Sequence, residues 1–265
     1  MTKNTTSNSV RYKASTKICL ETACKENPYQ AKKLYVSGYD IEELADKCSF
    51  IDMIFLMFTG EFAKSPEDKE LLKTLQMLLS ISSPRHPAAR AAMNCGICKA
   101  NEEHLLPISL MALGGSQSGA LEVKECINFI NENLEKSAEQ TADNLAKFWL
   151  NKHEHIAPGF GQLYGNPDCL SSSFLEKLST IKPEGKTIKW VSSFTTQLGK
   201  YHTGILDVGL AACIFNELSF GARESVGLYQ LLRAPGLLAY AMEQTHKPIS
   251  AMPMLEDDQY ELIKK

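Results

Sequence analysis

The sequence has no apolar run long enough to span a bilayer. Its longest run, from Phe50 to Thr59, already contains Asp52, whereas a membrane-spanning helix needs about 20 mostly apolar residues. An excess of positive charge is also missing, because the net charge is −3 and the sequence contains no block of Lys and Arg. A nucleic-acid-binding surface depends on such a block. The sequence therefore predicts neither a membrane protein nor a nucleic-acid-binding protein.

Cysteine pairs spaced for a metal site are scarce as well. Of the eight cysteines, only Cys95 and Cys98 stand close together, and a structural zinc site needs a second such pair. We therefore expect no metal centre. The first residues, Met1 to Val10, are polar and lack the apolar core of a signal peptide. Eight cysteines without that signal favour a reducing, cytoplasmic location, and residues 1–16 are expected to form a disordered tail.

The sequence does contain a long series of helical patterns. It has 265 residues, 44% hydrophobic and 22% charged, which is ordinary for a globular protein that buries a substantial core. Two strand-like segments, 17–22 and 33–37, come first and predict a short hairpin. The predicted helices then cover 41–45, 49–60, 65–79, 87–98, 102–113, 120–136, 139–152, 171–181, 190–200, 206–219 and 223–245. The fold class is therefore mainly α with a short N-terminal β-hairpin.

Seven motifs occur in an order and at spacings that resemble those of a known superfamily. They are Gly38 to Leu44, Ser49 to Glu61, Pro84 to Arg90, Leu113 to Ala120, Gly159-Phe-Gly161, Leu206 to Ala212 and Leu228 to Tyr240. Together they resemble the citrate synthase superfamily and, in size, its short citryl-CoA-lyase-like members. The resemblance extends from about Lys17 to Gln244.

The resemblance implies a citrate synthase-like fold of two helical domains, the smaller inserted into the larger. The large domain would comprise 17–118 and 223–265, and the inserted domain 119–222. It also implies a homodimer with an active site in the cleft between the domains. The substrates would be an acyl-CoA thioester, with coenzyme A not permanently bound, and a small oxo-acid or other carbonyl compound.

Asp207 matches the family's catalytic base, which removes the proton next to the thioester carbonyl. Asp207 is equally well explained as the N-cap of a helix beginning at Val208. Gly159, Phe160 and Gly161 match the family's coenzyme A loop, although a tight turn explains the glycines nearly as well. Arg233 matches a family arginine and is a candidate to bind a carboxylate or a phosphate.

The family's three histidine positions all differ in this chain. Ser118, or Gln117 in another register, stands where one histidine is expected, and Gln162 replaces the histidine of the loop. Each can donate a neutral hydrogen bond, but none changes charge near pH 7 as imidazole does. Alternatively, Ser118 caps a helix and Gln162 ties its turn together. His202 is a candidate replacement donor, or simply a solvated loop histidine.

The third histidine is missing near Ser80 to Ser83, and His86 lies closer to Arg90 than the motif requires. Cations are fewer too, because Asn166-Pro-Asp168 stands where the family has Asp-Pro-Arg. Fewer cations weaken the binding of a dicarboxylate, so the sequence argues against an orthodox citrate synthase.

Two hypotheses follow. In the first, the chain is a diverged acyl-CoA acyltransferase or lyase with Asp207 as base and with Gln162 and Ser118 as neutral donors. In the second, it is a catalytically inactive pseudoenzyme that binds coenzyme A or serves as a partner subunit, in a heterodimer with a related chain.

Overall fold

A computed structural model describes residues 16–149, 155–253, 256–261 and 263. The expected tail, apart from Thr16, lies outside the described residues. Contacts divide the chain into two units, Met1–Lys64 and Ser65–Lys265, and each unit is described by itself. The boundaries expected near 118 and 222 both fall inside the second unit, and that domain division stays a prediction.

The described part of the first unit, residues 16–64, contains a small antiparallel sheet and two helices. Strand β1 (Cys19–Ala23) pairs with β2 (Ala31–Val36), which in turn pairs with β3 (Tyr39–Asp40). The expected hairpin is confirmed, with β3 as an addition. Helices α1 (Ile41–Lys47) and α2 (Phe50–Thr59) follow. Ser49 caps α2 through a reciprocal pair of hydrogen bonds with Asp52, and Gly60 ends it at φ 81°.

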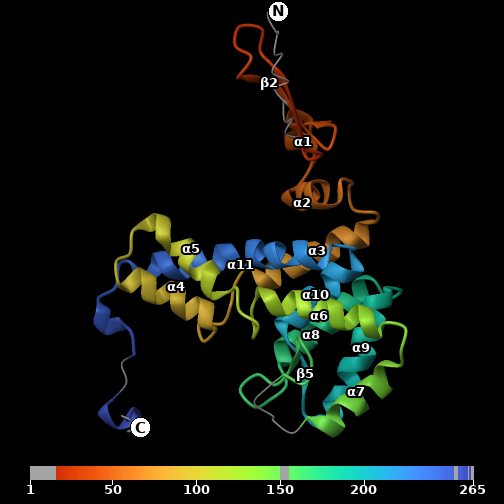
Figure 1. The fold of residues 1–265 in the computed structure, drawn as a ribbon, viewed down its shortest axis with the longest axis vertical. Coiled ribbons are helices and arrows are strands. Elements are labelled where there is room, and N and C mark those ends of the chain that lie inside the picture. The colour runs from red at the N-terminus through yellow and green to blue at the C-terminus, as the bar shows by residue number, and fades with distance from the viewer. Residues whose placement is uncertain (1–15, 150–154, 254–255, 262, 264–265) are drawn as a thin grey trace, which may run out of the picture. The chain divides into compact units, whose positions relative to one another are not determined.

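The second unit is built from nine helices and a two-stranded sheet among the described residues. The helices are α3 (Pro66–Leu79), α4 (Pro87–Ile97), α5 (Glu102–Ala112), α6 (Ala120–Asn133), α7 (Ala138–Phe148), α8 (Cys169–Ile181), α9 (Lys186–Leu198), α10 (Asp207–Glu217) and α11 (Ala222–Gln244). Strand β4 (Phe160–Gly161) pairs with β5 (Gly204–Ile205). The mainly α class is thus confirmed, and the long helix α11 runs beside α4, α5 and α6 (Figure 1).

Most predicted helices match the structure to within three residues at each end, and two differ by four residues at one end. Helix α9 begins at Lys186, before the expected Trp190, because the Thr187 N–H donates to the Glu217 carboxylate at 2.9 Å. That partner lies thirty residues further along the chain, so no local pattern marks the start. Helix α7 ends at Phe148, before the expected Lys152, and residues 150–152 lie outside the described part.

Helix α10 forms the centre of the second unit. All eight residues from Val208 to Phe215 are buried, and α3, α6, α8, α9 and α11 pack around the helix (Figure 1). A helix that is apolar on every side belongs in a core. Its first residue, Asp207, therefore lies where the core meets the surface. Among the described residues, no helix is both long and apolar enough to cross a membrane.

Candidate functional site

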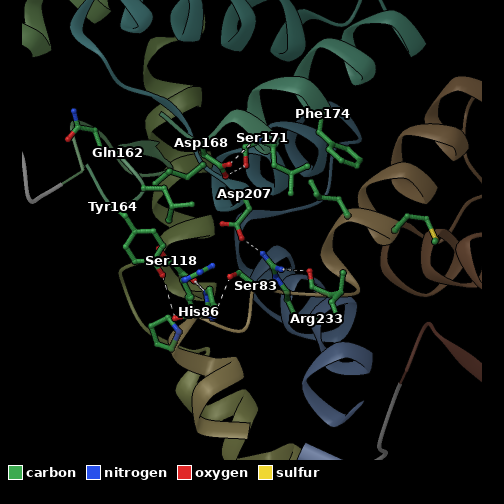
Figure 2. A pocket seen from close by; sticks show the side chains of 18 residues that line it. Ser83, His86, Ser118, Gln162, Tyr164, Asp168, Ser171, Phe174, Asp207 and Arg233 are labelled. Carbon is green, nitrogen blue, oxygen red and sulfur yellow. Dashed lines mark hydrogen bonds and ion pairs between the residues drawn. The ribbon is translucent and has the colours of Figure 1, made fainter. Parts of the chain in front are cut away.

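A pocket of about 600 Å³ opens in front of the first turn of α10 (Figure 2). Helix ends and turns supply most of its walls, and about half of the lining side chains are apolar. The lining residues are Met77, Leu78, Ile81, Ser83, Arg85, His86, Pro87, Ser118, Gln162, Leu163, Tyr164, Asp168, Leu170, Ser171, Phe174, Leu206, Asp207 and Arg233.

Asp207 occupies the first position of α10, and its side chain is 28% exposed to the pocket. The expected cap lies one residue earlier, because the helix begins at Asp207 and Leu206 is the N-cap. Oδ1 of Asp207 accepts the Val208 N–H at 2.7 Å, and Oδ2 accepts from Nη2 of Arg233. The positive end of the helix dipole favours a carboxylate at this position.

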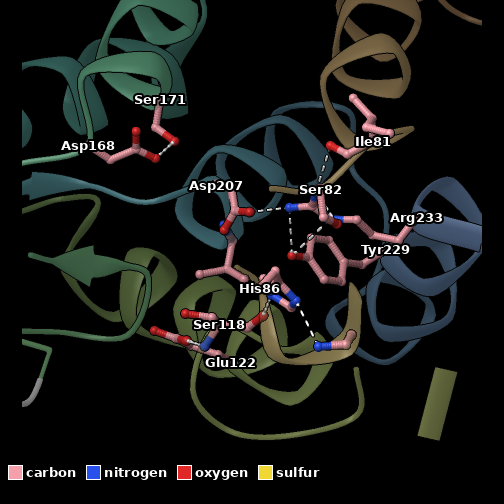
Figure 3. A network of polar contacts seen from close by, with 12 residues as sticks. Ile81, Ser82, His86, Ser118, Glu122, Asp168, Ser171, Asp207, Tyr229 and Arg233 are labelled. Atoms are coloured by element: carbon pink, nitrogen blue, oxygen red, sulfur yellow. Dashed lines mark hydrogen bonds and ion pairs between the residues drawn. The ribbon is translucent and has the colours of Figure 1, made fainter. Parts of the chain in front are cut away.

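Arg233 is 3% exposed and directs its guanidinium at Asp207 from α11 (Figure 3). Nη1 donates to the Ile81 carbonyl at 3.3 Å and to the Ser82 hydroxyl at 3.0 Å. Nε and Nη2 both donate to the Tyr229 hydroxyl, at 3.2 and 3.1 Å. With the bond to Asp207, all five N–H donors of the arginine are occupied. Arg233 therefore holds Asp207 in place and has no donor left for a ligand in this arrangement.

Tyr229 completes this network below the pocket. Its ring is fully buried, and burial, reinforced by the negative charge of Asp207, raises the pKa of its hydroxyl. Burial by itself lowers the pKa of Arg233, but Tyr229 and Asp207 outweigh it and raise that pKa. The buried cation is thus compensated by one carboxylate and one phenol oxygen. The sequence motif pointed to Arg233 but gave no sign of Tyr229.

His86 lines the same pocket, although its sequence position argued against it. Nδ1 accepts the Ala88 N–H at 3.1 Å, which makes His86 the N-cap of α4. Nε2 lies 2.9 Å from the Ser118 carbonyl, which only accepts, so Nε2 carries the proton. Burial lowers the pKa of His86, against the opposing effects of the Ser118 carbonyl and Asp207. The ring is therefore a neutral N–H donor beside Asp207 and Arg233.

Ser118 lies in the pocket lining, whereas Gln117 is exposed and outside it. The structure thus favours Ser118 as the residue that faces a ligand. Ser118 adopts a left-handed conformation with φ 54° and does not cap the helix, because the N-cap of α6 is Gly119. Its backbone N–H donates to Oε2 of Glu122 at 2.5 Å.

Glu122, which the sequence analysis missed, joins the segments behind the pocket. It is 1% exposed, and its Oε1 accepts the Gly159 N–H at 2.7 Å and contacts Nδ1 of His155 at 2.5 Å. Glu122 is the third residue of α6, where a glutamate often reaches back to free N–H groups before the helix. That position after Gly119 is the signal that could have identified it.

The turn Gly159-Phe160-Gly161 lies beneath the pocket and outside its lining. The Gly159 N–H donates to Glu122 and the Phe160 N–H to the Ala157 carbonyl. The Phe160 ring is fully buried and contacts Phe194 at a centroid distance of 4.8 Å. In this arrangement the turn positions the neighbouring segments, and its binding of coenzyme A stays a prediction.

Gln162 and His202 are joined to each other at the edge of the pocket. Nε2 of Gln162 donates to the His202 carbonyl at 2.9 Å, and Figure 2 shows the amide pointing away from Asp207. Gln162 therefore ties its turn to the next loop, one of the two roles considered for it. The His202 side chain is not part of the pocket lining. No cluster of His, Cys, Asp or Glu within the described residues is arranged to hold a metal ion.

Comparisons with solved structures identify the fold. Citryl-CoA lyase from Hydrogenobacter thermophilus aligns over 95% of this chain and 94% of its own, with a TM-score of 0.74 and 19% identity. ATP citrate lyase from Methanothrix soehngenii, solved with citrate and coenzyme A, aligns over 96% of this chain and 44% of its own, with a TM-score of 0.69 and 15% identity. Citrate synthase from Thermotoga maritima aligns over 97% and 96%, with a TM-score of 0.55 and 13% identity.

The sequence matches no protein-family model and none of the curated proteins with which it was compared. At identities below 20% the likeness to the solved structures establishes the fold and leaves the activity open. That fold is the citrate synthase-like fold, as the sequence motifs led us to expect.

Proposed function

We propose that this protein acts on an acyl-CoA thioester and forms or breaks a carbon–carbon bond next to the thioester carbonyl, with Asp207 as the base. The observation that carries the proposal is the placement of Asp207. It stands at the start of a buried helix, partly exposed to a pocket of about 600 Å³ and fixed by a buried arginine. A carboxylate held in this way is suited to proton abstraction.

In the forming direction, the Asp207 carboxylate takes a proton from the α-carbon and becomes a carboxylic acid. The electron pair of the C–H bond moves into a thioester enolate, whose oxygen requires a hydrogen-bond donor. The Ser118 hydroxyl lines the pocket together with Asp207 and is the proposed donor. The enolate carbon then bonds to the carbonyl carbon of the second substrate, and the electron pair of the C=O π bond moves to the oxygen. That oxygen takes a proton from water, and Asp207 returns its proton to water and becomes a carboxylate again. Cleavage runs the same steps in reverse.

An orthodox citrate synthase is not the function we propose. A dicarboxylate substrate requires free cations, and Arg233 uses its five N–H donors within the protein. The Gln162 amide, proposed from the sequence as a donor, is engaged by the His202 carbonyl. The one N–H of the neutral His86 ring is likewise used by the Ser118 carbonyl. We therefore assign the donor role to the Ser118 hydroxyl, and treat Gln162 as a residue that positions its turn.

Coenzyme A enters the proposal as part of the substrate. A second pocket of about 460 Å³ shares Arg85 and Tyr164 with the first and adds Arg90 and Lys247. Arg85, Arg90 and Lys247, the last of which also pairs with the exposed Glu243, are the cations proposed to bind the phosphates of the coenzyme. The co-substrate is a small oxo-acid or other carbonyl compound. We also propose a homodimer in the cytoplasm, a location that the eight free cysteines support.

A second candidate is a catalytically inactive protein that binds coenzyme A, or a partner subunit in a heterodimer with a related chain. The observation that favours it is the closed Asp207–Arg233–Tyr229 network, in which carboxylate and guanidinium satisfy each other. Loss of a donor at such a site commonly lowers the rate by about 10² or more. A site without the three histidines of the family can therefore still bind a ligand while it no longer catalyses a reaction.

Exchange of α-protons tests both candidates. The purified protein is incubated with short acyl-CoA thioesters in deuterated water, and deuterium in the acyl group is measured by mass spectrometry. We expect exchange that falls by about 10²–10⁴ in Asp207→Asn, since general-base catalysis is of that size. Asp40→Asn, which replaces the N-cap of α1 with an equally good cap, is the matched control. Binding of coenzyme A by calorimetry without any exchange would support the inactive protein, whereas absence of both would reject both candidates.

A further inference from the structure

Four polar residues in the lining of the main pocket, Asp168, Asp207, Arg233 and His86, already have partners within the protein. Arg233 and Asp207 pair with each other. Asp168 accepts the Leu170 N–H at 3.0 Å and the Ser171 hydroxyl at 2.5 Å. Both ring nitrogens of His86 have partners as well. These groups therefore need no ligand to satisfy their hydrogen bonds.

Charge in the lining is balanced as well. Its formally charged residues are Asp168, Asp207, Arg85 and Arg233, so two negative charges meet two positive ones. Among the described residues, Arg85 is the one lining cation that forms no ion pair, and it is exposed. A dicarboxylate would place two negative charges against a single available cation. Burying the unpaired carboxylate would be unfavourable.

Apolar side chains are left uncovered in the same pocket. Met77 on α3, Ile81 in the following turn and Leu170 on α8 are 66%, 55% and 60% exposed. With Leu78 and Phe174 they form a wall supplied by α3, the turn that follows it and α8, and Figure 2 shows Phe174 on the α8 side of Asp207. Large apolar side chains that remain exposed around a concave site indicate a ligand that covers them.

We propose that this wall binds the acyl chain of the thioester, and that the chain is aliphatic and several carbons long. This inference rests on the proposed function, which puts the α-carbon next to Asp207, so that the rest of the acyl group extends into the pocket. A pocket of about 600 Å³ lies within the range of sites that enclose ligands of drug size, and an acetyl group leaves most of it empty. The enzyme is thus selective for medium-chain acyl groups over acetyl groups and over acyl groups that end in a carboxylate, whose burial against the apolar wall is unfavourable.

Calorimetric titration of the full chain with acetyl-CoA, hexanoyl-CoA and succinyl-CoA tests the proposal. Each buried CH₂ contributes about 0.8 kcal/mol, or about fourfold in affinity, and hexanoyl adds four carbons to acetyl. We expect hexanoyl-CoA to bind at least about tenfold more tightly than acetyl-CoA and than succinyl-CoA. Equal affinities, or tighter binding of succinyl-CoA, would overturn it.

Variants of the apolar wall test whether it causes the preference for hexanoyl-CoA over acetyl-CoA. The double variant Leu170→Gln with Met77→Gln changes two exposed side chains of the pocket and should reduce the preference for hexanoyl over acetyl about fivefold or more. Leu121→Gln is the matched control, because Leu121, like Leu170, is an exposed leucine at the second position of a helix, and it lies outside the pocket. A preference unchanged in the double variant would overturn the assignment.

Proton exchange separates this proposal from the proposed function. A hexanoyl preference in binding without exchange of α-protons would retain the acyl pocket and reject the catalytic role of Asp207. Exchange that is as fast with acetyl-CoA as with hexanoyl-CoA, combined with equal binding, would retain the catalytic role and reject the acyl pocket.

Discussion

Two carboxylates at helix starts, Asp207 and Glu122, have opposite surroundings. Asp207 is the first residue of α10 and Glu122 the third of α6. Asp207 is 28% exposed to the pocket and is paired with the buried Arg233. Glu122 is 1% exposed, and its oxygens are occupied by the Ser118 and Gly159 N–H groups and by His155.

The difference separates a group that can react from one that fixes the backbone. Glu122 joins the turn just before its own helix to the segment that contains His155 and Gly159, more than thirty residues further along the chain. Each oxygen of Asp207 accepts one hydrogen bond, from the Val208 N–H and from Arg233, and the side chain remains 28% exposed. Helix starts favour a carboxylate in either case, so exposure and the type of partner decide which of the two is available for chemistry.

The largest effect on stability is expected from Glu122→Gln. The new NH₂ group must face a backbone N–H or His155, leaving buried donors without acceptors, which costs about 4 kcal/mol in free energy of unfolding. Asp207→Asn should cost less, about 2–3 kcal/mol, because the amide oxygen can still accept from Arg233 although the charge that compensates the buried guanidinium is lost. Urea denaturation measures both.

Glu125→Gln on the exposed face of α6 is the matched control and should change the unfolding free energy by less than about 0.5 kcal/mol. Equal losses in Glu122→Gln and Asp207→Asn would show that both carboxylates serve the scaffold.

A smaller difference in unfolding free energy is expected between alanine variants of two glycines that have positive φ, Gly159 and Gly165. A Cβ at Gly159 would lie 2.6 Å from Sγ of Cys126 and 2.8 Å from Cα of Gly209, at φ 80°. At Gly165, with φ 84°, it would meet nothing within 4 Å. We expect Gly159→Ala to cost about 3 kcal/mol through overpacking and backbone strain, and Gly165→Ala about 1 kcal/mol through strain alone. Thermal unfolding of the two variants compares them, and similar losses would mean that the Gly159 turn is not held against α10.

The sequence predicted the helices well because their signals are local. Ser49 and Gly60 bound α2 by capping chemistry that three or four residues supply. The start of α9 was misplaced because its N–H groups are satisfied by Glu217 from another helix. Short β4 and β5 were not predicted because two residues carry no periodic pattern.

Only the site residues that belong to a recognisable sequence motif could be predicted. Asp207 and Ser118 were named from motifs, and the structure brings both to one pocket. His86 and Tyr229 were not, because their roles depend on contacts with segments far away in the sequence. The glycines of Gly159-Phe-Gly161 indicate that another group approaches the backbone closely. The sequence does not say whether that group is a ligand or Glu122, because the answer depends on how distant segments pack.

The smallest predicted effect is the pH dependence of stability, which tests the charge of His86 in the pocket that it shares with Asp207. Burial lowers the pKa of His86 in the folded state, so below about pH 6.5 the unfolded chain binds a proton that the folded chain does not. The contribution of His86 to stability is therefore complete above that pH and declines as the pH falls, by at most about 1.4 kcal/mol per pH unit.

The variant His86→Asn isolates this effect, because asparagine keeps an N-cap acceptor for α4 but does not titrate. Unfolding free energies of both proteins, measured from pH 8 to pH 5, should differ by a constant above about pH 7. Below about pH 6.5 the wild-type protein should lose stability relative to the variant, with the slope set by the one histidine. A difference that grows in the opposite direction would mean that His86 is protonated next to Asp207. In that case the ring is an imidazolium, and Asp207 has a second cation in the same pocket in addition to Arg233.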